Sequence, residues 1–120
     1  MKRETAKRLL DARNACSEIE QFATGETWAS IRTNRGLQLI LQTLISNIGE
    51  ALNQMSQSDP ETANDIPDLR SIVGMRNQIV HGYDSVDYFI VWKVATEDIP
   101  SLATVLDDLL KDAPPVQSFE

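Results

Sequence analysis

The chain has 120 residues, which is long enough for one compact domain around a single core and too short for a separate substrate domain. With 42% hydrophobic and 24% charged residues, and no apolar run near the roughly 20 residues that span a bilayer, we expect a soluble globular protein that does not bind membranes. The formal net charge of −7 disfavours broad, non-specific binding to DNA, so a nucleic-acid substrate would need a local basic cleft.

The N-terminal segment carries basic residues but no following apolar stretch, so it does not resemble a secretory signal peptide, and we expect a cytoplasmic protein. Cys16 is the only cysteine, which excludes an intrachain disulfide and a metal site with several cysteine ligands. Because Cys16 falls on an apolar helical stripe, we expect its thiol to be buried in the core. The basic residues available for a cleft in the middle of the chain are Arg32, Arg35, Arg70, Arg76 and Lys93.

The first predicted helix has apolar residues at intervals of three and four, and Gly25 follows it as a candidate C-cap. Its stripe consists of Leu9, Ala12, Cys16, Ile19 and Ala23. Residues 26–32 are predicted to be a short connection that carries Trp28. Thr33 or Asn34 can cap a longer second helix. The stripe of this second helix is Leu37, Ile40, Leu41, Leu44, Ile48, Ala51, Leu52 and Met55.

The second half of the chain is predicted to hold three further helices. Residues 56–67 are polar and contain two X-Pro steps, which indicates a loop with room for one helical turn. A third helix is expected after Pro67, with Gly82 suited to ending it. A fourth begins after residues 84–85, and a fifth begins near Asp98 with a proline in its first turn.

No segment shows sustained two-residue alternation, and the chain has no internal repeat. The sequence therefore predicts an all-α fold, an antiparallel bundle of four to five helices. Residues 1–112 are expected to form this single domain, and residues 113–120, which include two consecutive prolines, to form a flexible tail. Gly49 inside the second helix indicates close helix packing. Trp28 and Trp92 are expected in the core or a dimer interface rather than as base-stacking platforms, and Tyr88 and Phe89 are expected to pack.

Position 76 lies on the apolar stripe of the third helix, where an arginine is unexpected. A guanidinium that points inward needs an anionic partner, and Glu50 or Asp87 could form a structural ion pair with it. His81 is the only histidine, and a single histidine is commonly a capping or packing residue. Asn77 lies four residues before His81, on the same helical face, and could orient the imidazole through a hydrogen bond. The end of a helix favours the imidazolium form, which suits a proton donor near neutral pH.

An arginine and a histidine match one reaction well, the transesterification of RNA. The substrate supplies its own 2′-hydroxyl nucleophile, and the enzyme contributes proton transfer and charge stabilisation at the phosphate. The sequence has no carboxylate cluster with metal-ligand spacing and no glycine-rich phosphate loop, so we expect neither a metal nor another cofactor. Chemistry of the Ser-His-Asp type stays open, although no Gly-x-Ser-x-Gly motif is present. Arg76 and His81 are thus the predicted catalytic pair.

The run from Arg76 to Tyr83 is similar to the Arg-x4-His-x-Tyr signature of HepT-like toxins in the HEPN superfamily. In the second helix, Ile48-Gly49-Glu50-Ala51 resembles the Ile-Gly-Glu-Ala segment of that family. The resemblance extends in order, without a large gap, over about residues 5–111. Further segments that resemble the family are Val86-Asp87, Ile90-Val91-Trp92 and Asp98-Ile99-Pro100-Ser101-Leu102.

The resemblance implies an endoribonuclease toxin of a toxin–antitoxin system, which cuts RNA without a metal and forms a homodimer with both motifs at a composite cleft. The partner in such systems is a minimal nucleotidyltransferase antitoxin that transfers AMP to the motif tyrosine, here Tyr83, and so blocks the site. The resemblance also places Glu50 at the active cleft as a supporting residue. A helical wheel puts Glu50 on the polar side of the second helix, which could face the cleft or water.

A second hypothesis is a non-catalytic helical subunit that binds a nucleotide or a nucleotidyltransferase and uses Arg76 to hold phosphate. The sequence leaves open whether the RNA target is messenger or transfer RNA, how many AMP units are added, and the antitoxin stoichiometry. Both hypotheses predict the same fold. Cleavage of RNA by the purified protein in the presence of a chelator distinguishes them.

Overall fold

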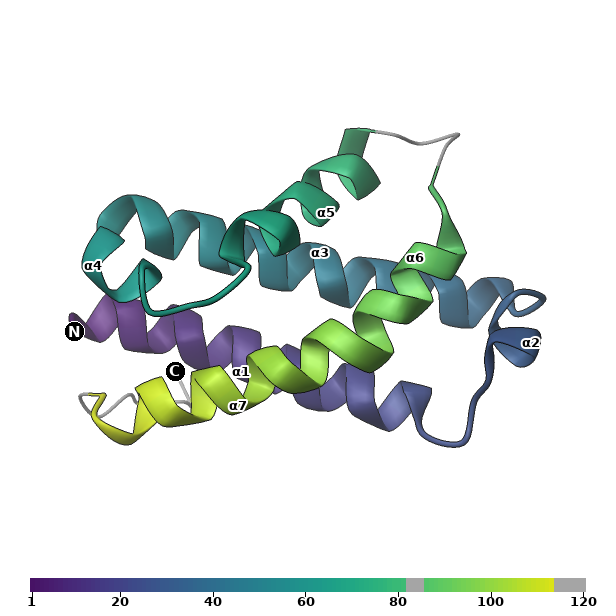
Figure 1. Cartoon of the computed structure of the whole chain (residues 1–120), viewed down its shortest axis with the longest axis horizontal. Coiled ribbons are helices and arrows are strands. Elements are labelled where there is room, and N and C mark those ends of the chain that lie inside the picture. Colours follow the sequence, from purple (N-terminus) through teal and green to yellow (C-terminus); the bar gives the residue numbers. More distant parts are fainter. Residues whose placement is uncertain (82–85, 114–120) are drawn as a thin grey trace.

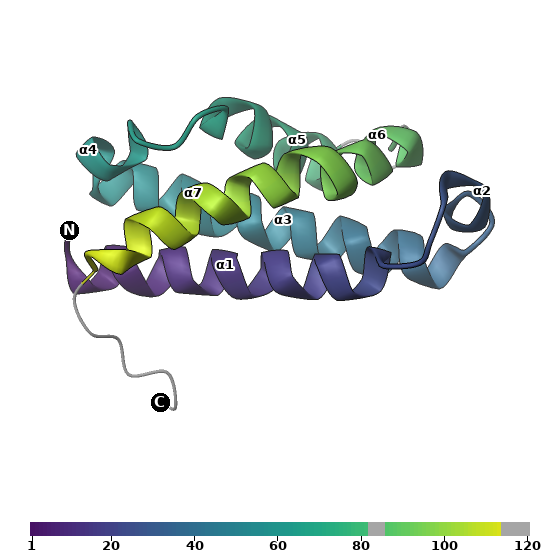
Figure 2. The same cartoon turned by 60° about the horizontal axis from the view of Figure 1, so that its bottom comes forward.

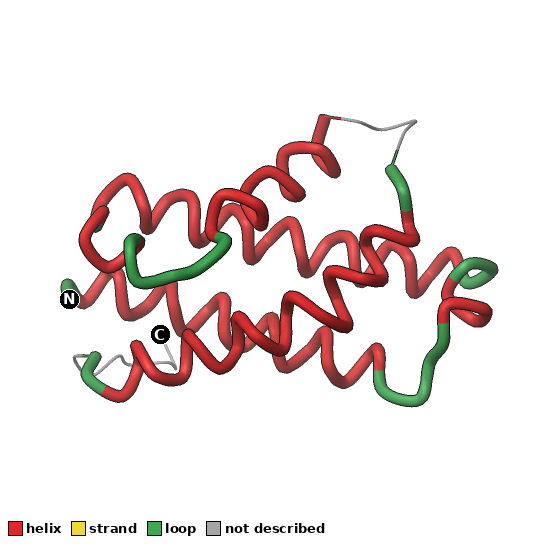
Figure 3. Tube along the Cα trace, in the orientation of Figure 1, coloured by secondary structure: helices red, strands yellow, loops and turns green. Residues whose placement is uncertain are grey.

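The computed structural model describes residues 1–81 and 86–113, and the side chains of residues 78–81 fall outside that description. Within the described residues every regular element is a helix (Figure 3). The predicted all-α class and helical bundle are therefore confirmed. Residues 114–120, which make up most of the predicted tail, lie outside the described residues. In the described part of the chain, no helix is long and apolar enough to cross a membrane.

Two long helices form the base of the bundle, α1 (Arg3–Ala23) and α3 (Arg35–Ser58). They lie side by side and run in opposite directions (Figures 1 and 2). The helix α7 (Ile99–Lys111) packs along α1, and α5 (Leu69–His81) packs along α3. This arrangement places the helix that carries the arginine–histidine motif directly on the longest helix of the chain.

The core is built from the apolar stripes that the sequence predicts. Fully buried side chains of α1 and α3 face each other and meet those of α7, and the set includes Leu9, Ile19, Leu41, Ile45, Ile48, Leu52, Met55, Ile99 and Leu106. Cys16 belongs to this core with 1% exposure, as expected. Burial raises the pKa of its thiol to about 11, because the thiolate would lose hydration in an apolar setting.

Side-chain caps fix where the helices begin and end. The side chain of Asn34 accepts a hydrogen bond of 3.0 Å from the backbone N–H of Leu37, which sets the start of α3 as predicted. Gly25 adopts φ +80° just after α1, a left-handed conformation that glycine tolerates without strain. Asp59 ends α3 and caps the short α4 (Pro60–Ala63), the helical turn for which the predicted loop had room.

The connection predicted at residues 26–32 contains a short helix, α2 (Trp28–Ile31). The side chain of Thr27 accepts from the backbone N–H of Ser30 at 3.2 Å, and the Ser30 hydroxyl accepts from the N–H of Thr27 at 2.9 Å. This reciprocal pair is a capping box, which satisfies two backbone donors at the helix start. It stabilises a helix that is too short to show an apolar period.

The predicted fifth helix begins where expected, since α7 starts at Ile99 with Pro100 in its first turn, but no loop separates it from the helix before it. The helix α6 (Tyr88–Lys93) continues through a π-helical segment, η2 (Val94–Asp98), directly into α7. Pro100 lacks the N–H that an α-helix would direct to the carbonyl four residues earlier, and its ring would collide with that carbonyl. The wider turn accommodates it, since the N–H of Ile99 bonds instead to the carbonyl of Val94, five residues back.

Candidate active site

The helices α3 and α5 are in close contact at Gly49 of α3 and Arg76 of α5. Of the described glycines, Gly49 has the least room for a side chain. A Cβ on Gly49 would overlap the Cβ of Arg76 and would lie 2.9 Å from its Cγ and 3.4 Å from the carbonyl oxygen of Ile72. The absence of a side chain at Gly49 therefore allows the backbone of α3 to support the stem of Arg76. This is the close helix packing that the sequence predicted.

The guanidinium of Arg76 is held by two polar neighbours. Its Nη2 forms an ion pair with Oε2 of Glu50, and its Nη1 donates a hydrogen bond of 2.9 Å to Oδ1 of Asn77. The side chain of Arg76 is 24% exposed and that of Glu50 is 40% exposed. Nε of Arg76 is buried and has no hydrogen-bond partner among the described residues. Two of the three guanidinium nitrogens thus have partners within the described part of the chain.

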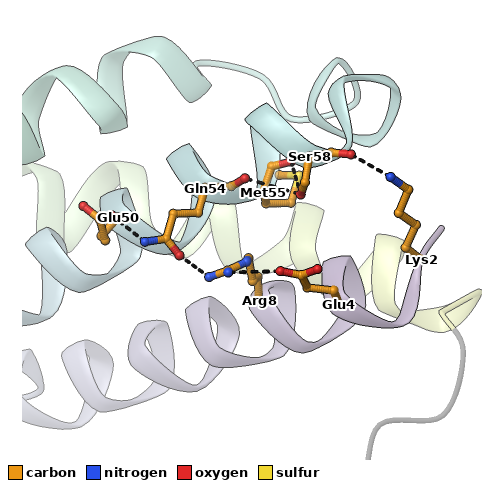
Figure 4. Close-up of polar contacts among 7 residues, drawn as sticks. All are labelled: Lys2, Glu4, Arg8, Glu50, Gln54, Met55 and Ser58. Carbon is orange, nitrogen blue, oxygen red and sulfur yellow. Dashed lines mark hydrogen bonds and ion pairs between the residues drawn. The ribbon is translucent and has the colours of Figure 1, made fainter.

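Glu50 is itself fixed by a chain of side chains that crosses to α1 (Figure 4). Nε2 of Gln54 donates to Oε1 of Glu50 at 2.7 Å, and Nη1 of Arg8 donates to Oε1 of Gln54. Arg8 also forms an ion pair of 3.2 Å with Glu4 one turn earlier on α1. This series of side-chain contacts links α1, α3 and α5, and it restrains the carboxylate that contacts Arg76.

The structure brings together three of the predicted site residues, Arg76, Asn77 and Glu50. Asn77 contacts Arg76, and its predicted hydrogen bond to His81 falls outside the described side chains. His81 is the last residue of α5, but its side chain is not among those described. Tyr83 lies outside the described residues. The catalytic role of the pair and the modification of Tyr83 therefore stay predictions.

Asp87, the alternative partner proposed for Arg76, has a different role. Its carboxylate accepts hydrogen bonds from the backbone N–H groups of Phe89 at 3.0 Å and Ile90 at 3.4 Å, and so caps α6. A carboxylate at this position also interacts favourably with the positive end of the helix dipole. Glu50 is thus the anionic partner of Arg76.

Sequence reasoning missed Gln54 and Arg8. Gln54 follows Glu50 by four residues, so their contact could have been found from helical spacing. Nothing in the sequence pairs Arg8 with Gln54, because that contact depends on how α1 packs against α3.

A separate groove of about 540 Å³ runs on another side of α5, facing η2 and α7. Ile72 and Met75 line it from α5, and Val94, Leu102 and Val105 line it from the facing helix. Arg76 does not contribute to its wall. The ion pair and the groove therefore lie on different sides of α5.

A family model described as "Ribonuclease HepT-like" matches residues 12–109. "Probable ribonuclease HepT" of Thermococcus cleftensis is 30% identical over 111 residues, which cover 92% of this chain and all of that protein. "Putative RNase MJ1216" of Methanocaldococcus jannaschii is 26% identical over 111 residues, with 92% of this chain and 91% of that protein covered. No solved structure gave a significant match. The chain therefore belongs to the HepT-like ribonuclease family.

Proposed function

We propose that this protein is an endoribonuclease toxin that cleaves RNA in the cytoplasm by attack of the 2′-hydroxyl on the adjacent phosphate. The observation that carries the proposal is the supported guanidinium of Arg76 on α5, five residues before the only histidine, in a chain of the HepT-like ribonuclease family. A fixed, planar cation is suited to a phosphodiester.

In the proposed reaction, Arg76 binds the non-bridging oxygens of the scissile phosphate. Negative charge grows on these oxygens as the 2′-oxygen attacks, so a cation placed there beforehand stabilises the transition state more than the ground state. The phosphate takes over guanidinium donors that the free protein directs to Glu50. Because the Glu50 side chain is 40% exposed, its carboxylate can be hydrated when the arginine turns to the substrate.

His81 supplies the proton transfer. The 2′-hydroxyl loses its proton to a base, the bond from the 2′-oxygen to phosphorus forms, and the bond from phosphorus to the 5′-oxygen breaks. The leaving 5′-oxygen takes up a proton, which leaves a 2′,3′-cyclic phosphate and a 5′-hydroxyl. In a two-fold homodimer, His81 of one copy accepts the first proton as a neutral base and then returns it to the leaving 5′-oxygen, at a phosphate held by Arg76 of the second copy. No metal is required for this sequence of steps.

The test is cleavage of a single-stranded RNA by the purified protein in excess chelator, followed by analysis of the product ends. We expect cyclic phosphate and 5′-hydroxyl ends from the wild type and no products from His81→Ala or Arg76→Ala with unchanged helical circular dichroism. Unchanged cleavage by His81→Ala would remove the proposed mechanism. Absence of cleavage by the wild type would favour the non-catalytic subunit hypothesis.

We further propose that a cognate nucleotidyltransferase antitoxin silences the toxin by transferring AMP to Tyr83. This position is two residues beyond His81 in the sequence. An attached AMP adds a phosphodiester anion of the same kind that Arg76 is proposed to bind. The modification would then inhibit by occupying the arginine and by blocking access of RNA.

The regulatory proposal is tested by co-expression with the nucleotidyltransferase. We expect the intact mass of the wild type to increase in whole adenylyl units, and Tyr83→Phe to stay toxic without being silenced. Silencing of Tyr83→Phe to the same extent as the wild type, with no mass increase in either protein, would show that control comes from simple binding.

A further inference from the structure

The helix α2, the start of α3 and the start of α6 meet at one end of the bundle (Figure 1). Aromatic and basic side chains gather there. The group consists of Trp28 from α2, Arg35 from α3, and Tyr88, Phe89 and Lys93 from α6. We name it the aromatic–basic cluster. Its aromatic residues were expected to pack, and one of them does not follow that expectation. Phe89 is 45% exposed, and neither the core nor a described cap accounts for its position.

The exposed ring of Phe89 has an aromatic and a cationic neighbour. The ring centroids of Trp28 and Phe89 are 5.2 Å apart with an interplanar angle of 75°. In such an edge-to-face pair, only one of the four ring faces is covered by the other ring. Nζ of Lys93 lies 5.9 Å from the Phe89 centroid. Flat apolar surface thus lies next to an exposed positive charge.

Arg35 forms the second basic part of the cluster. Its guanidinium carbon lies 5.5 Å from the centroid of the Tyr88 ring, and its Nη1 donates to the Tyr88 hydroxyl at 2.8 Å. The Tyr88 hydroxyl in turn donates to Oε1 of Gln42 at 2.6 Å. Neither Arg35 nor Lys93 takes part in the ion pairs formed among the described residues. Two cations outside those ion pairs thus lie beside exposed aromatic surface in a chain of net charge −7.

We propose that the aromatic–basic cluster binds single-stranded RNA next to the cleavage site, with a base stacked on Phe89 and backbone phosphates at Lys93 and Arg35. Proteins that bind single strands without reading sequence combine these two elements, because every base offers a π-face and every nucleotide carries a phosphate. The inference rests on the proposed ribonuclease function and names how that substrate is held.

The position of the cluster on α3 fits this role. Gln42, which accepts from Tyr88, and Gly49, which supports Arg76, are seven residues apart on α3. Seven residues are almost two helical turns, so both positions lie on one side of α3 and about 10 Å apart along its axis. A stacked nucleic-acid strand rises about 3.4 Å per nucleotide. A strand whose scissile phosphate lies at Arg76 would reach Tyr88 about three nucleotides away.

The same patch could instead be an interface with a protein. The buried centre of a protein interface is depleted of charged residues, whereas here Lys93 and Arg35 stand directly over the aromatic rings. Charge therefore favours a polyanion as the occupant, and a protein interface is an outcome that the experiment must detect.

The probe is a short fluorescent oligouridine in which every 2′-hydroxyl is methylated, so that it cannot be cleaved by internal attack. Its dissociation constant is measured by fluorescence anisotropy with the full chain. Phe89→Ala is expected to weaken binding about tenfold, the effect of losing one stacked base. Phe22→Ala is the matched control, because Phe22 is 42% exposed on α1 outside the cluster. It is expected to leave the dissociation constant unchanged.

The charge contribution is read from the salt dependence of the same measurement. Lys93→Gln is expected to reduce the slope of log K against log salt concentration by about 0.7, the value for one phosphate contact on a single strand. Lys7→Gln removes an exposed lysine of α1 and is expected to leave the slope unchanged. Equal slopes for the two variants would overturn the phosphate contact at Lys93.

Three further results would overturn the proposal: no saturable binding by the wild type, equal binding by Phe89→Ala and Phe22→Ala, or a lower oligomer mass for Phe89→Ala in light scattering. The last would identify the patch as an interface between copies. Failure of the ribonuclease proposal is seen separately, as the absence of cleavage of unmodified RNA by the wild type. If cleavage requires Arg76 and His81 but Phe89→Ala does not change the dissociation constant, the ribonuclease proposal stands and only the proposed role of the cluster is wrong.

Discussion

The guanidinium of Arg76 forms an ion pair with the carboxylate of Glu50 in the free protein, so a substrate phosphate must compete with Glu50 for it. Glu50 holds the guanidinium in place but also competes with any phosphate for it. The competition is mild because the carboxylate is partly hydrated, and a phosphodiester offers two oxygens that match the planar fork of an arginine. Glu50 thus acts as a support for the arginine in the free protein and as a group that the substrate displaces.

A first prediction follows for Arg76→Lys. Lysine can keep the ion pair with Glu50, so the helical content and the thermal stability should change little. An ammonium cannot bind a phosphate through two parallel hydrogen bonds, and the loss of one charge-assisted bond of about 1.5–3 kcal/mol should lower the cleavage rate at least about tenfold. The measurement is the rate of RNA cleavage at saturating protein.

Arg70→Lys is the control for this variant, because Arg70 is an exposed arginine on the same helix. It should cleave at the wild-type rate. A lysine at position 76 that supports full activity would mean that charge alone, without fork geometry, carries the contact with phosphate.

The sequence predicted that an arginine at position 76 would need an anionic partner, but it could not choose between Glu50 and Asp87. The choice depends on two facts of packing that no spacing rule contains. The carboxylate of Asp87 accepts backbone hydrogen bonds at the start of α6. Gly49 allows α3 to come close enough to α5 for Glu50 to contact Arg76. His81 and Tyr83 were singled out by sequence alone, and the described residues leave their roles as predictions.

At the scale of elements, the contact between α3 and α5 determines where the arginine stands. Helix packing distances are set by the side chains at the crossing, and a glycine there permits the shortest approach. Any side chain at position 49 would have to displace the stem of Arg76 or the backbone of α5 near Ile72. The glycine therefore couples the position of the site to the packing of the bundle.

A second prediction tests this coupling with three glycine-to-alanine variants. Gly49→Ala should destabilise the protein by about 1–3 kcal/mol, the usual cost of overpacking, and should reduce cleavage because Arg76 is displaced. Gly74→Ala should instead stabilise it by about 0.5–1 kcal/mol, since a Cβ there meets no atom of the described residues within 4 Å and alanine favours a helix. The measurement is urea denaturation together with RNA cleavage.

Gly36→Ala is the second control, because a Cβ at that position of α3 would make only an ordinary contact of 3.6 Å with Asn34. It separates a general effect of alanine in α3 from an effect specific to the crossing. If Gly49→Ala proved as stable and as active as Gly36→Ala, the close approach at Arg76 would have no role in holding the site.

The long helices were predictable because each buries a stripe that recurs at helical spacing over many residues. The helix α2 was not, since four residues cannot show a period, and its signal was the reciprocal capping of Thr27 and Ser30. The start of a helix near Asp98 was also predictable from Pro100, but its continuity with α6 through a π-helical turn was not. A widened turn has no simple signature in the residues that form it.

At the scale of the whole molecule, the proposed site is composite. The proposed reaction needs a cation at the phosphate and a group that takes a proton from one oxygen and gives it to another, and Arg76 of one copy and His81 of the other fill these two roles. Two copies related by a two-fold axis would supply both histidines and both arginines to one groove. The dimer is therefore part of the proposed mechanism.

A third prediction concerns this sharing of the site. Arg76→Ala and His81→Ala chains should each be inactive, and a mixture that is unfolded and refolded together should recover part of the wild-type cleavage. The recovery should depend on co-refolding, because exchange between copies is required. Light scattering on the wild type at micromolar concentration should return twice the mass of one chain. A mass of one chain, or an inactive mixture, would contradict a composite site.

Because Cys16 is buried, the arrangement of two copies can be measured as a distance between labels attached to an introduced cysteine. With the only thiol of the chain inside the core and its pKa near 11, the native cysteine stays almost wholly protonated at neutral pH and does not react with alkylating labels. A cysteine introduced at an exposed position of α1, such as Asp11→Cys, can then carry a spin label without removing the native one. Each copy would bear one label, so a single distance between labels would report the geometry of the pair, with and without RNA.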